Sequence, residues 1–196
     1  MIICLIGFMG CGKSSVGRRL SELLCCPFMD LDDVIETREG RSIPEIFATD
    51  GEAVFRQMEL SSLQRIVLSE VVINDGKLHL TEHDATAVLA LGGGTVMTKE
   101  CAELVKENTC CIYLRASVET LLSHLEGESA GRPMLHTVPH AVISSETEGR
   151  DEKSSLQSRI EDLMAARSAT YENTAHIIID TDGQSVGSVA EMILKY

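Results

Sequence analysis

A glycine-rich run at residues 7–14, GFMGCGKS, constrains the fold of this chain more than any other feature. It follows an apolar stretch at 2–6 and precedes a segment at 13–24 whose apolar side chains recur at helical spacing. The spacing G-x-x-x-x-G-K-S lets the backbone curl so that successive N–H groups converge on phosphate oxygens. A chance glycine-rich turn is the alternative, but strand, loop and helix occur here in the order that phosphate binding requires. The run therefore predicts a nucleotide-binding loop, in which Lys13 adds a positive charge and Ser14 a hydroxyl ligand for magnesium.

Apolar runs of strand length alternate with helical patterns along the rest of the chain. Strands are expected at 2–6, 27–30, 86–91, 110–114 and 176–180. Helices are expected at 13–24, from about 33 to Gly40, from Ser42 onward, at 52–69, after the glycines at 92–94, at 117–126 and at the C-terminus. Continuously apolar strands separated by helices favour a parallel sheet covered on both faces, so the predicted fold class is α/β.

Unusual polar or glycine residues follow three of these strands. The first strand ends at the phosphate loop, the second at Asp30 and Asp32, and the third at Gly92-Gly93-Gly94. Ligands of parallel sheets bind beyond the carboxyl ends of the strands, where all three features would meet. Two aspartates there suit a magnesium ion and a substrate hydroxyl, although capping of the next helix also accounts for them. The glycines favour close approach of the backbone to a ligand, with a flexible turn as the alternative.

Three arginines, Arg56, Arg132 and Arg167, are candidates to complete a site for an anionic substrate. A planar guanidinium suits bidentate capture of a carboxylate, and a mobile one suits the charge that develops on a transferring phosphoryl group. Taken alone, each arginine is more typical of a solvated surface side chain, so the hypothesis rests on their combination with the loop.

The formal net charge of −13 and the isoelectric point near 4.8 argue against binding to nucleic acid or to an anionic membrane surface. The sequence contains no run of about 18 apolar residues and no signal-peptide layout, so a cytoplasmic location is expected. The seven cysteines, including the pairs Cys25-Cys26 and Cys110-Cys111, are expected to be reduced thiols of the core.

Together, these stretches resemble the shikimate kinase family, small phosphoryl-transfer enzymes of the nucleoside monophosphate kinase group. The resemblance rests on GFMGCGKSSVGRRL (7–20), DLD (30–32), GRSIPEIFATDGEAVFRQME (40–59), LALGGGTV (89–96), GRPML (131–135) and MAARSATY (164–171). It implies a single domain over 1–196 with a three-layer αβα P-loop kinase fold, a central five-stranded parallel sheet and a mobile lid at about 127–152. A shikimate-binding region would span about 32–60.

The resemblance also implies roles for individual residues. ATP phosphates would be held by Gly10, Cys11, Gly12, Lys13, Ser14 and Ser15, with Arg132 reaching them from the lid. Mg²⁺ would be held by Ser14 and Asp30. Shikimate would be bound by Asp32, Arg56, Gly93, Gly94 and Arg167, with Phe47 and Phe55 walling its ring. Lys13, Asp32 and Arg132 would be catalytic, with Asp32 as the base for the hydroxyl that is phosphorylated.

The implied reaction converts MgATP and shikimate to ADP and shikimate 3-phosphate, a step of aromatic amino acid biosynthesis, in a monomeric enzyme. The chain departs from the family pattern in a longer lid connection at about 136–153 and an extension at about 70–86, whose Asn74-Asp75-Gly76 predicts a hairpin turn. The arginine that usually stacks on adenine is replaced near Ser123 and His124, and the adenine loop reads TDGQSVGS. A kinase of another small acceptor, such as a sugar acid or nucleotide, and a regulatory nucleotide-binding module are the alternatives.

Overall fold

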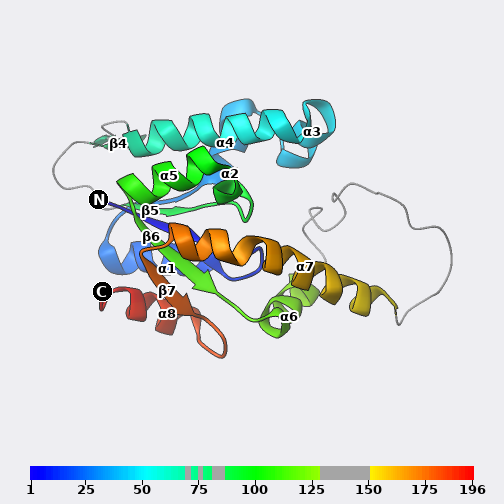
Figure 1. Ribbon diagram of the computed structural model, residues 1–196. Helices are drawn as coiled ribbons and strands as arrows, with labels where there is room; N and C mark the ends of the chain where they lie inside the picture. Colours follow the sequence, from blue (N-terminus) through cyan, green and yellow to red (C-terminus); the bar gives the residue numbers. More distant parts are fainter. Residues whose placement is uncertain (69–71, 75–76, 81–86, 129–150) are drawn as a thin grey trace.

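The computed structural model describes residues 1–68, 72–74, 77–80, 87–128 and 151–196 (Figure 1). Its main sheet consists of β1 (Ile2–Ile6), β2 (Phe28–Asp30), β5 (Ala87–Ala90), β6 (Cys110–Arg115) and β7 (Ile177–Asp180). All neighbouring strands are parallel, and their order is β2-β5-β1-β6-β7. The predicted five-stranded parallel sheet is confirmed.

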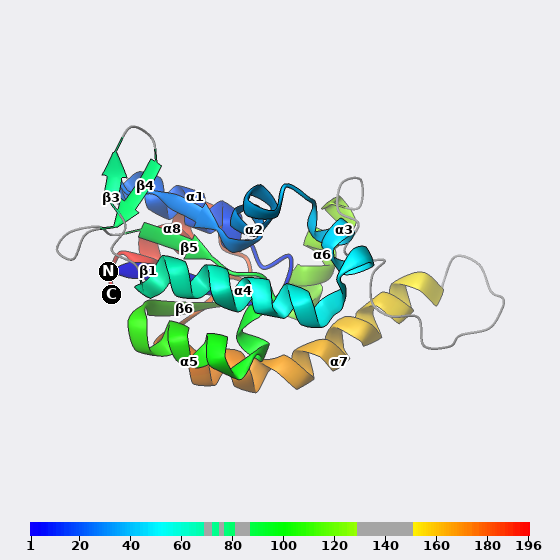
Figure 2. The same ribbon diagram turned by 90° about the horizontal axis from the view of Figure 1, so that it is seen from above.

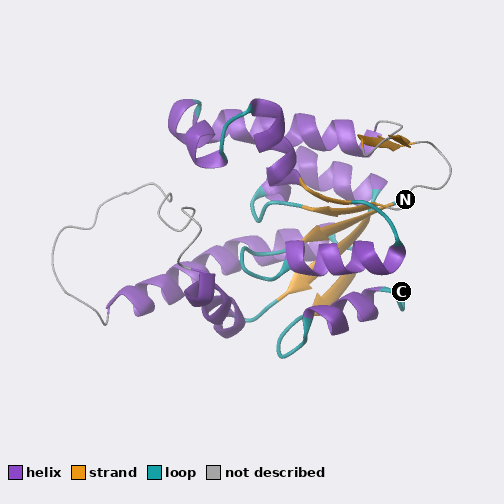
Figure 3. Ribbon diagram, turned by 180° about the vertical axis from the view of Figure 1, so that it is seen from behind, coloured by secondary structure: helices purple, strands orange, loops and turns teal. Residues whose placement is uncertain are grey.

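Helices cover both faces of this sheet, which gives the three layers expected (Figure 3). One face carries α1 (Lys13–Leu24) and α8 (Val186–Ile193), and the other carries α4 (Gly51–Leu68) and α5 (Lys99–Asn108) (Figures 1 and 2). The alternation of β1 accounts for the two faces, since Ile3 and Leu5 pack with α1 and α8, whereas Cys4 and Ile6 pack with α4 and α5. The remaining helices are α2 (Leu31–Glu39), α3 (Ile43–Thr49), the short 3₁₀ helix η1 (Thr95–Met97), α6 (Val118–Glu128) and α7 (Asp151–Thr174).

The helix boundaries follow their capping residues. The predicted start at Ser42 is confirmed, because its backbone N–H donates to Glu45 Oε2 at 2.8 Å in a capping box. The helix expected from about 33 to Gly40 is confirmed as α2, although it begins at Leu31, two residues before the expected start. The reason is that the Asp30 carboxylate accepts a hydrogen bond from the Asp32 N–H and caps the helix two residues earlier.

The extension before β5 contains β3 (Val72–Asn74) and β4 (Lys77–Leu80), which pair antiparallel as the hairpin prediction requires. The tip of this hairpin, at 75–76, lies outside the described residues. Figures 1 and 2 place the pair near the two chain termini, at the end of the molecule opposite α3 and α6. The predicted lid also lies outside the described residues between 129 and 150.

All seven cysteines are free thiols. Cys4, Cys11, Cys101 and Cys111 are buried as expected, but Cys25 is exposed because it ends α1 in a left-handed conformation (φ 51°) at the surface. Within the described part of the chain, no helix is long and apolar enough to cross a bilayer.

Candidate active site

Residues 7–12 form a curled loop that follows the central strand β1, and Lys13 and Ser14 begin α1. Gly7, Gly10 and Gly12 have φ values of 145°, 79° and 88°, which side-chain-bearing residues rarely adopt. The first turn of α1 carries no acidic residue of its own, so the helix adds no negative charge to the positive end of its dipole, which faces the loop. Lys13 Nζ lies across the loop and donates to the carbonyls of Gly7 and Phe8, both at 2.9 Å. This arrangement suits an anionic phosphate.

Ser14 and Asp30 meet beside this loop. Ser14 Oγ donates to Asp30 Oδ2 at 2.7 Å, while Asp30 Oδ1 caps α2. Asp30 is therefore both a helix cap and a candidate ligand, because its two oxygens serve different partners. Among the described residues, no group of three or more His, Cys, Asp or Glu side chains is arranged to hold a metal. One hydroxyl and one carboxylate oxygen fit Mg²⁺, which keeps several waters and binds phosphates rather than an all-protein cage.

Asp32 lies in the first turn of α2 and not at the end of β2 as expected. Its carboxylate faces the glycine run, since a Cβ on Gly92 would lie 3.1 Å from Asp32 Oδ1. Burial raises the pKa of Asp32 to about 7, with further increases from the charges of Asp30 and Glu59 and a decrease from Lys13. A carboxylate with this pKa can take up a proton near neutral pH.

Arg56 projects from α4 and lies against Gly94. A Cβ on Gly94 would lie only 2.7 Å from Arg56 Nη2, so a glycine is needed for this close approach. Arg56 Nη1 donates to Glu59 Oε2 at 2.6 Å, and Nη2 donates to Glu52 Oε1 at 3.1 Å. Glu59 is only 1% exposed and also accepts from the Thr95 hydroxyl at 2.5 Å. The guanidinium is thus held in a fixed plane beside the glycine run.

Arg167 reaches the same region from α7. Its guanidinium carbon lies 5.8 Å from the ring centroid of Phe8, which belongs to the phosphate loop. Four residues later on α7, the Tyr171 hydroxyl donates to the Gly93 carbonyl at 2.5 Å. The structure therefore brings Arg167 and Gly93 together around Tyr171.

Phe47 and Phe55 form an aromatic pair with ring centroids 4.7 Å apart. Phe55 is buried, and the Arg56 guanidinium carbon lies 5.5 Å from the centroid of its ring, so the pair adjoins the guanidinium. Arg132 lies outside the described residues, and its predicted roles remain predictions.

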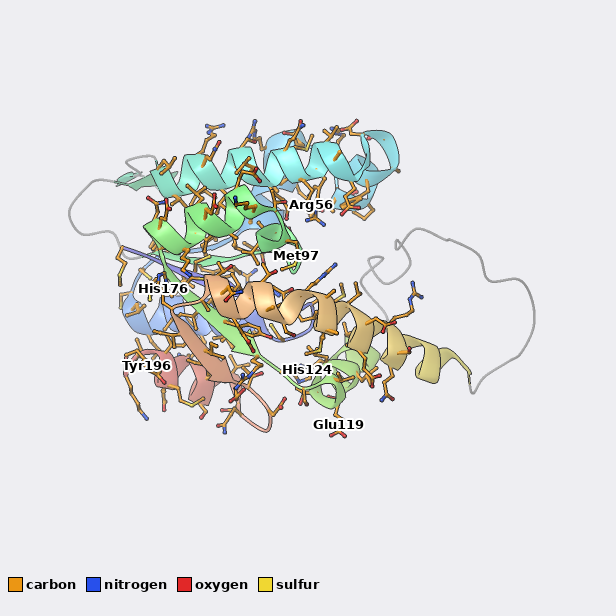
Figure 4. The ribbon with its side chains drawn as sticks, in the orientation of Figure 1. Arg56, Met97, Glu119, His124, His176 and Tyr196 are labelled. Carbon is orange, nitrogen blue, oxygen red and sulfur yellow. The ribbon has the colours of Figure 1, made fainter. Side chains whose placement is uncertain are left out.

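Sequence reasoning missed four residues of this region. Glu59 belongs to the buried face of α4, four residues after Phe55. A carboxylate at a position where the helical spacing predicts an apolar residue could have indicated a functional group. Nothing in the sequence distinguishes Thr95 or Tyr171 from the residues beside them. In the sequence, His124 is notable only because it lies where an adenine-stacking arginine is expected. In the structure, its Nδ1 lies 2.8 Å from the Gly10 carbonyl oxygen. In Figure 4, Arg56 and His124 lie toward the same end of the molecule, whereas His176 lies toward the end with the termini.

Comparison with known proteins gives concordant results. A family model described as shikimate kinase matches residues 9–196. A shikimate kinase of Thermus thermophilus is 36% identical over 98% of this chain and 88% of its own length. One from Chlorobium phaeobacteroides is 32% identical over 99% of this chain and 89% of its own length. The solved shikimate kinase of Acinetobacter baumannii, in complex with shikimate, superimposes with a TM-score of 0.77 and 30% identity over 99% of this chain and 90% of that chain.

Proposed function

Because this chain belongs to the shikimate kinase family, its reaction is the ATP-dependent phosphorylation of the 3-hydroxyl of shikimate, and we propose which residues carry it. The loop at 7–14 is the donor half of the active site, and the groups around Gly92–Gly94 are the acceptor half. The observation that supports this assignment most directly is that a Cβ added to any of these three glycines would crowd a group from another element: Asp32, the phosphate loop or Arg56.

In the donor half, backbone N–H groups from Gly10 to Ser15 bind the ATP phosphates, and Lys13 exchanges its carbonyl partners for phosphate oxygens. Ser14 and Asp30 would hold Mg²⁺ with a hydroxyl and a carboxylate. When bound, this ion neutralises phosphate charge. Arg132, from the predicted lid, adds positive charge to the transferring phosphoryl group.

In the acceptor half, Arg56 and Arg167 bind the substrate carboxylate, assisted by backbone contacts from Gly93 and Gly94. Two guanidinium groups at one carboxylate allow an acidic protein to bind an acidic substrate. Phe47 and Phe55 form an apolar wall for the ring, because the Phe55 ring adjoins Arg56 and Phe47 packs against Phe55.

Asp32 orients the substrate hydroxyl and takes its proton as the oxygen bonds to the γ-phosphorus and the bond to the β-phosphate oxygen breaks. Its pKa of about 7 matches this task near neutral pH. Alignment of the two substrates and charge neutralisation supply most of the acceleration, and proton removal is a smaller contribution.

We also propose that residues 1–196 form one catalytic domain that acts as a cytoplasmic monomer on ATP and shikimate, without nucleic acid or membrane partners. The supporting observations are the charge of −13 and the small, charged nature of both substrates.

An ADP-release assay tests the function with shikimate, gluconate and nucleoside monophosphates as acceptors. We expect turnover with shikimate far above the ATP-only background and background rates with the others. Turnover with gluconate or a nucleotide in place of shikimate would establish another kinase. ATP binding without turnover on any acceptor would establish a nucleotide-binding module.

A further inference from the structure

The triple glycine is tied to α7 by one side-chain hydrogen bond over a long sequence distance. The Gly92 and Gly94 carbonyls accept from the backbone N–H groups of Thr95 and Met97, within the local turn that begins η1. The Gly93 carbonyl instead accepts from the Tyr171 hydroxyl, 78 residues later in the chain. The Gly93 carbonyl is therefore held by a side chain of a separate element, whereas the carbonyls of its two neighbours make the hydrogen bonds of the turn.

The orientation of Gly93 also determines that of Gly94. The Gly93 carbonyl and the Gly94 N–H belong to the same planar peptide unit and point in opposite directions. Glycine peptides rotate more easily than others because neither residue has a Cβ. A hydrogen bond that holds the carbonyl toward Tyr171 consequently holds the Gly94 N–H away from it. Gly94 is the glycine that lies against Arg56.

Tyr171 is itself rigidly placed. Its side chain is 1% exposed, and its ring stacks on Tyr113 of β6 with centroids 5.1 Å apart. Burial raises the pKa of Tyr171, so its hydroxyl stays protonated and able to donate. Arg167 lies one helical turn earlier on α7, and its charge partly offsets this increase in pKa. Because residues four apart on a helix lie on the same face, a shift of α7 that displaces Tyr171 also displaces Arg167.

We propose that Tyr171 is a positioning residue of the acceptor site. Through the Gly93 carbonyl it fixes the peptide plane that presents the Gly94 N–H to the substrate, and it holds Arg167 in register with the glycine run. This inference rests on the proposed function, because it assigns both groups to the binding of shikimate. Tyr171 acts through its neighbours and makes no contact with the reacting atoms.

The test compares Tyr171→Phe with Tyr113→Phe, because each removes one buried hydroxyl from the same stacked pair and only Tyr171 bonds to Gly93. We expect Tyr171→Phe to raise the KM for shikimate about three- to tenfold, the range that corresponds to one lost hydrogen bond. The KM for MgATP should stay within twofold. Tyr113→Phe should leave both constants within twofold of the wild type.

A second readout is the increase in unfolding temperature that shikimate produces, which can also be measured on a destabilised variant. A smaller increase for Tyr171→Phe than for Tyr113→Phe supports the proposal. Equal shikimate KM values and equal increases for the two variants would overturn it and leave Tyr171 a packing residue. If the wild type itself fails to use shikimate, the proposed function fails and the inference falls with it.

Discussion

Ser14 and Asp30 are joined by a 2.7 Å hydrogen bond that links the start of α1 to the end of β2. The two oxygens are the candidate protein contacts of Mg²⁺, and the fold alone makes them adjacent. The hydrogen bond ties the first turn of α1 to the end of β2, where the proposed phosphate and metal sites meet.

We predict that Ser14→Ala and Asp30→Asn each raise the Mg²⁺ concentration for half-maximal activity about tenfold or more. Asparagine caps a helix as well as aspartate does, so Asp30→Asn should leave α2 intact and alter mainly the metal. The measurement is a Mg²⁺ titration of turnover at fixed ATP. Asp162→Asn, at an exposed position on α7, is the control. Unchanged Mg²⁺ dependence in both site variants would remove this pair from the metal site.

His124 offers a test of the donor half. A carbonyl can only accept, so His124 Nδ1 must carry the proton that it shares with the Gly10 carbonyl at 2.8 Å. We predict that His124→Ala raises the KM for MgATP about three- to tenfold, because the loop loses this support. The KM for shikimate should not change. Ser123→Ala, whose hydroxyl donates within α6 to the Thr120 carbonyl, should behave as the wild type. An unaltered MgATP KM in His124→Ala would exclude the role.

The parts of the site that could be predicted from sequence are those in which neighbouring residues along the chain together specify the function. The loop at 7–14 was predictable because glycines at this spacing, followed by Lys13 and Ser14, are typical of phosphate binding. The sequence could not decide whether Asp30 is a helix cap or a candidate metal ligand, since one carboxylate can take both roles. Glu59 and Tyr171 were missed because their partners, Thr95 and Gly93, come from another part of the chain. In a sequence, a tyrosine on the buried face of a helix has the same spacing whether it only packs in the core or also bonds to a distant peptide group.

Gly94 and Arg56 allow a steric test of the acceptor half. Gly94 has φ −105°, which alanine can adopt, so Gly94→Ala should fold. Its methyl group would lie within 3.1 Å of three guanidinium atoms and displace Arg56. We predict a roughly tenfold increase in the shikimate KM and little change for MgATP.

The double variant Gly94→Ala/Arg56→Ala should bind shikimate no worse than Arg56→Ala alone, because both changes remove the same interaction, that of Arg56 with the substrate. Gly187→Ala in α8 is the control, since among the described residues the nearest atom outside the local helix backbone is Ser185 Oγ, 3.9 Å from the added methyl group. Fully additive losses in the double variant would show that Gly94 acts independently of Arg56.

Asp32 should make the free protein less stable as the pH rises. Its pKa in the folded protein is about 7, against about 3.9 in an unfolded chain. Between these values the folded state binds more protons than the unfolded state, so the free energy of unfolding falls as the pH rises from 4 to 7 and levels off above. Asparagine carries no charge and removes this dependence.

We therefore predict that Asp32→Asn loses at least a hundredfold in turnover yet exceeds the wild type in stability at pH 8, by roughly 1–4 kcal/mol. The difference should be clearly smaller at pH 5, where the folded wild type is already protonated at Asp32. Chemical denaturation at the two pH values measures it, with Asp162→Asn as an exposed carboxylate control. If Asp32→Asn were less stable than the wild type at pH 8, the carboxylate would be a stabilising group, and its assignment as a base held at a raised pKa would be wrong.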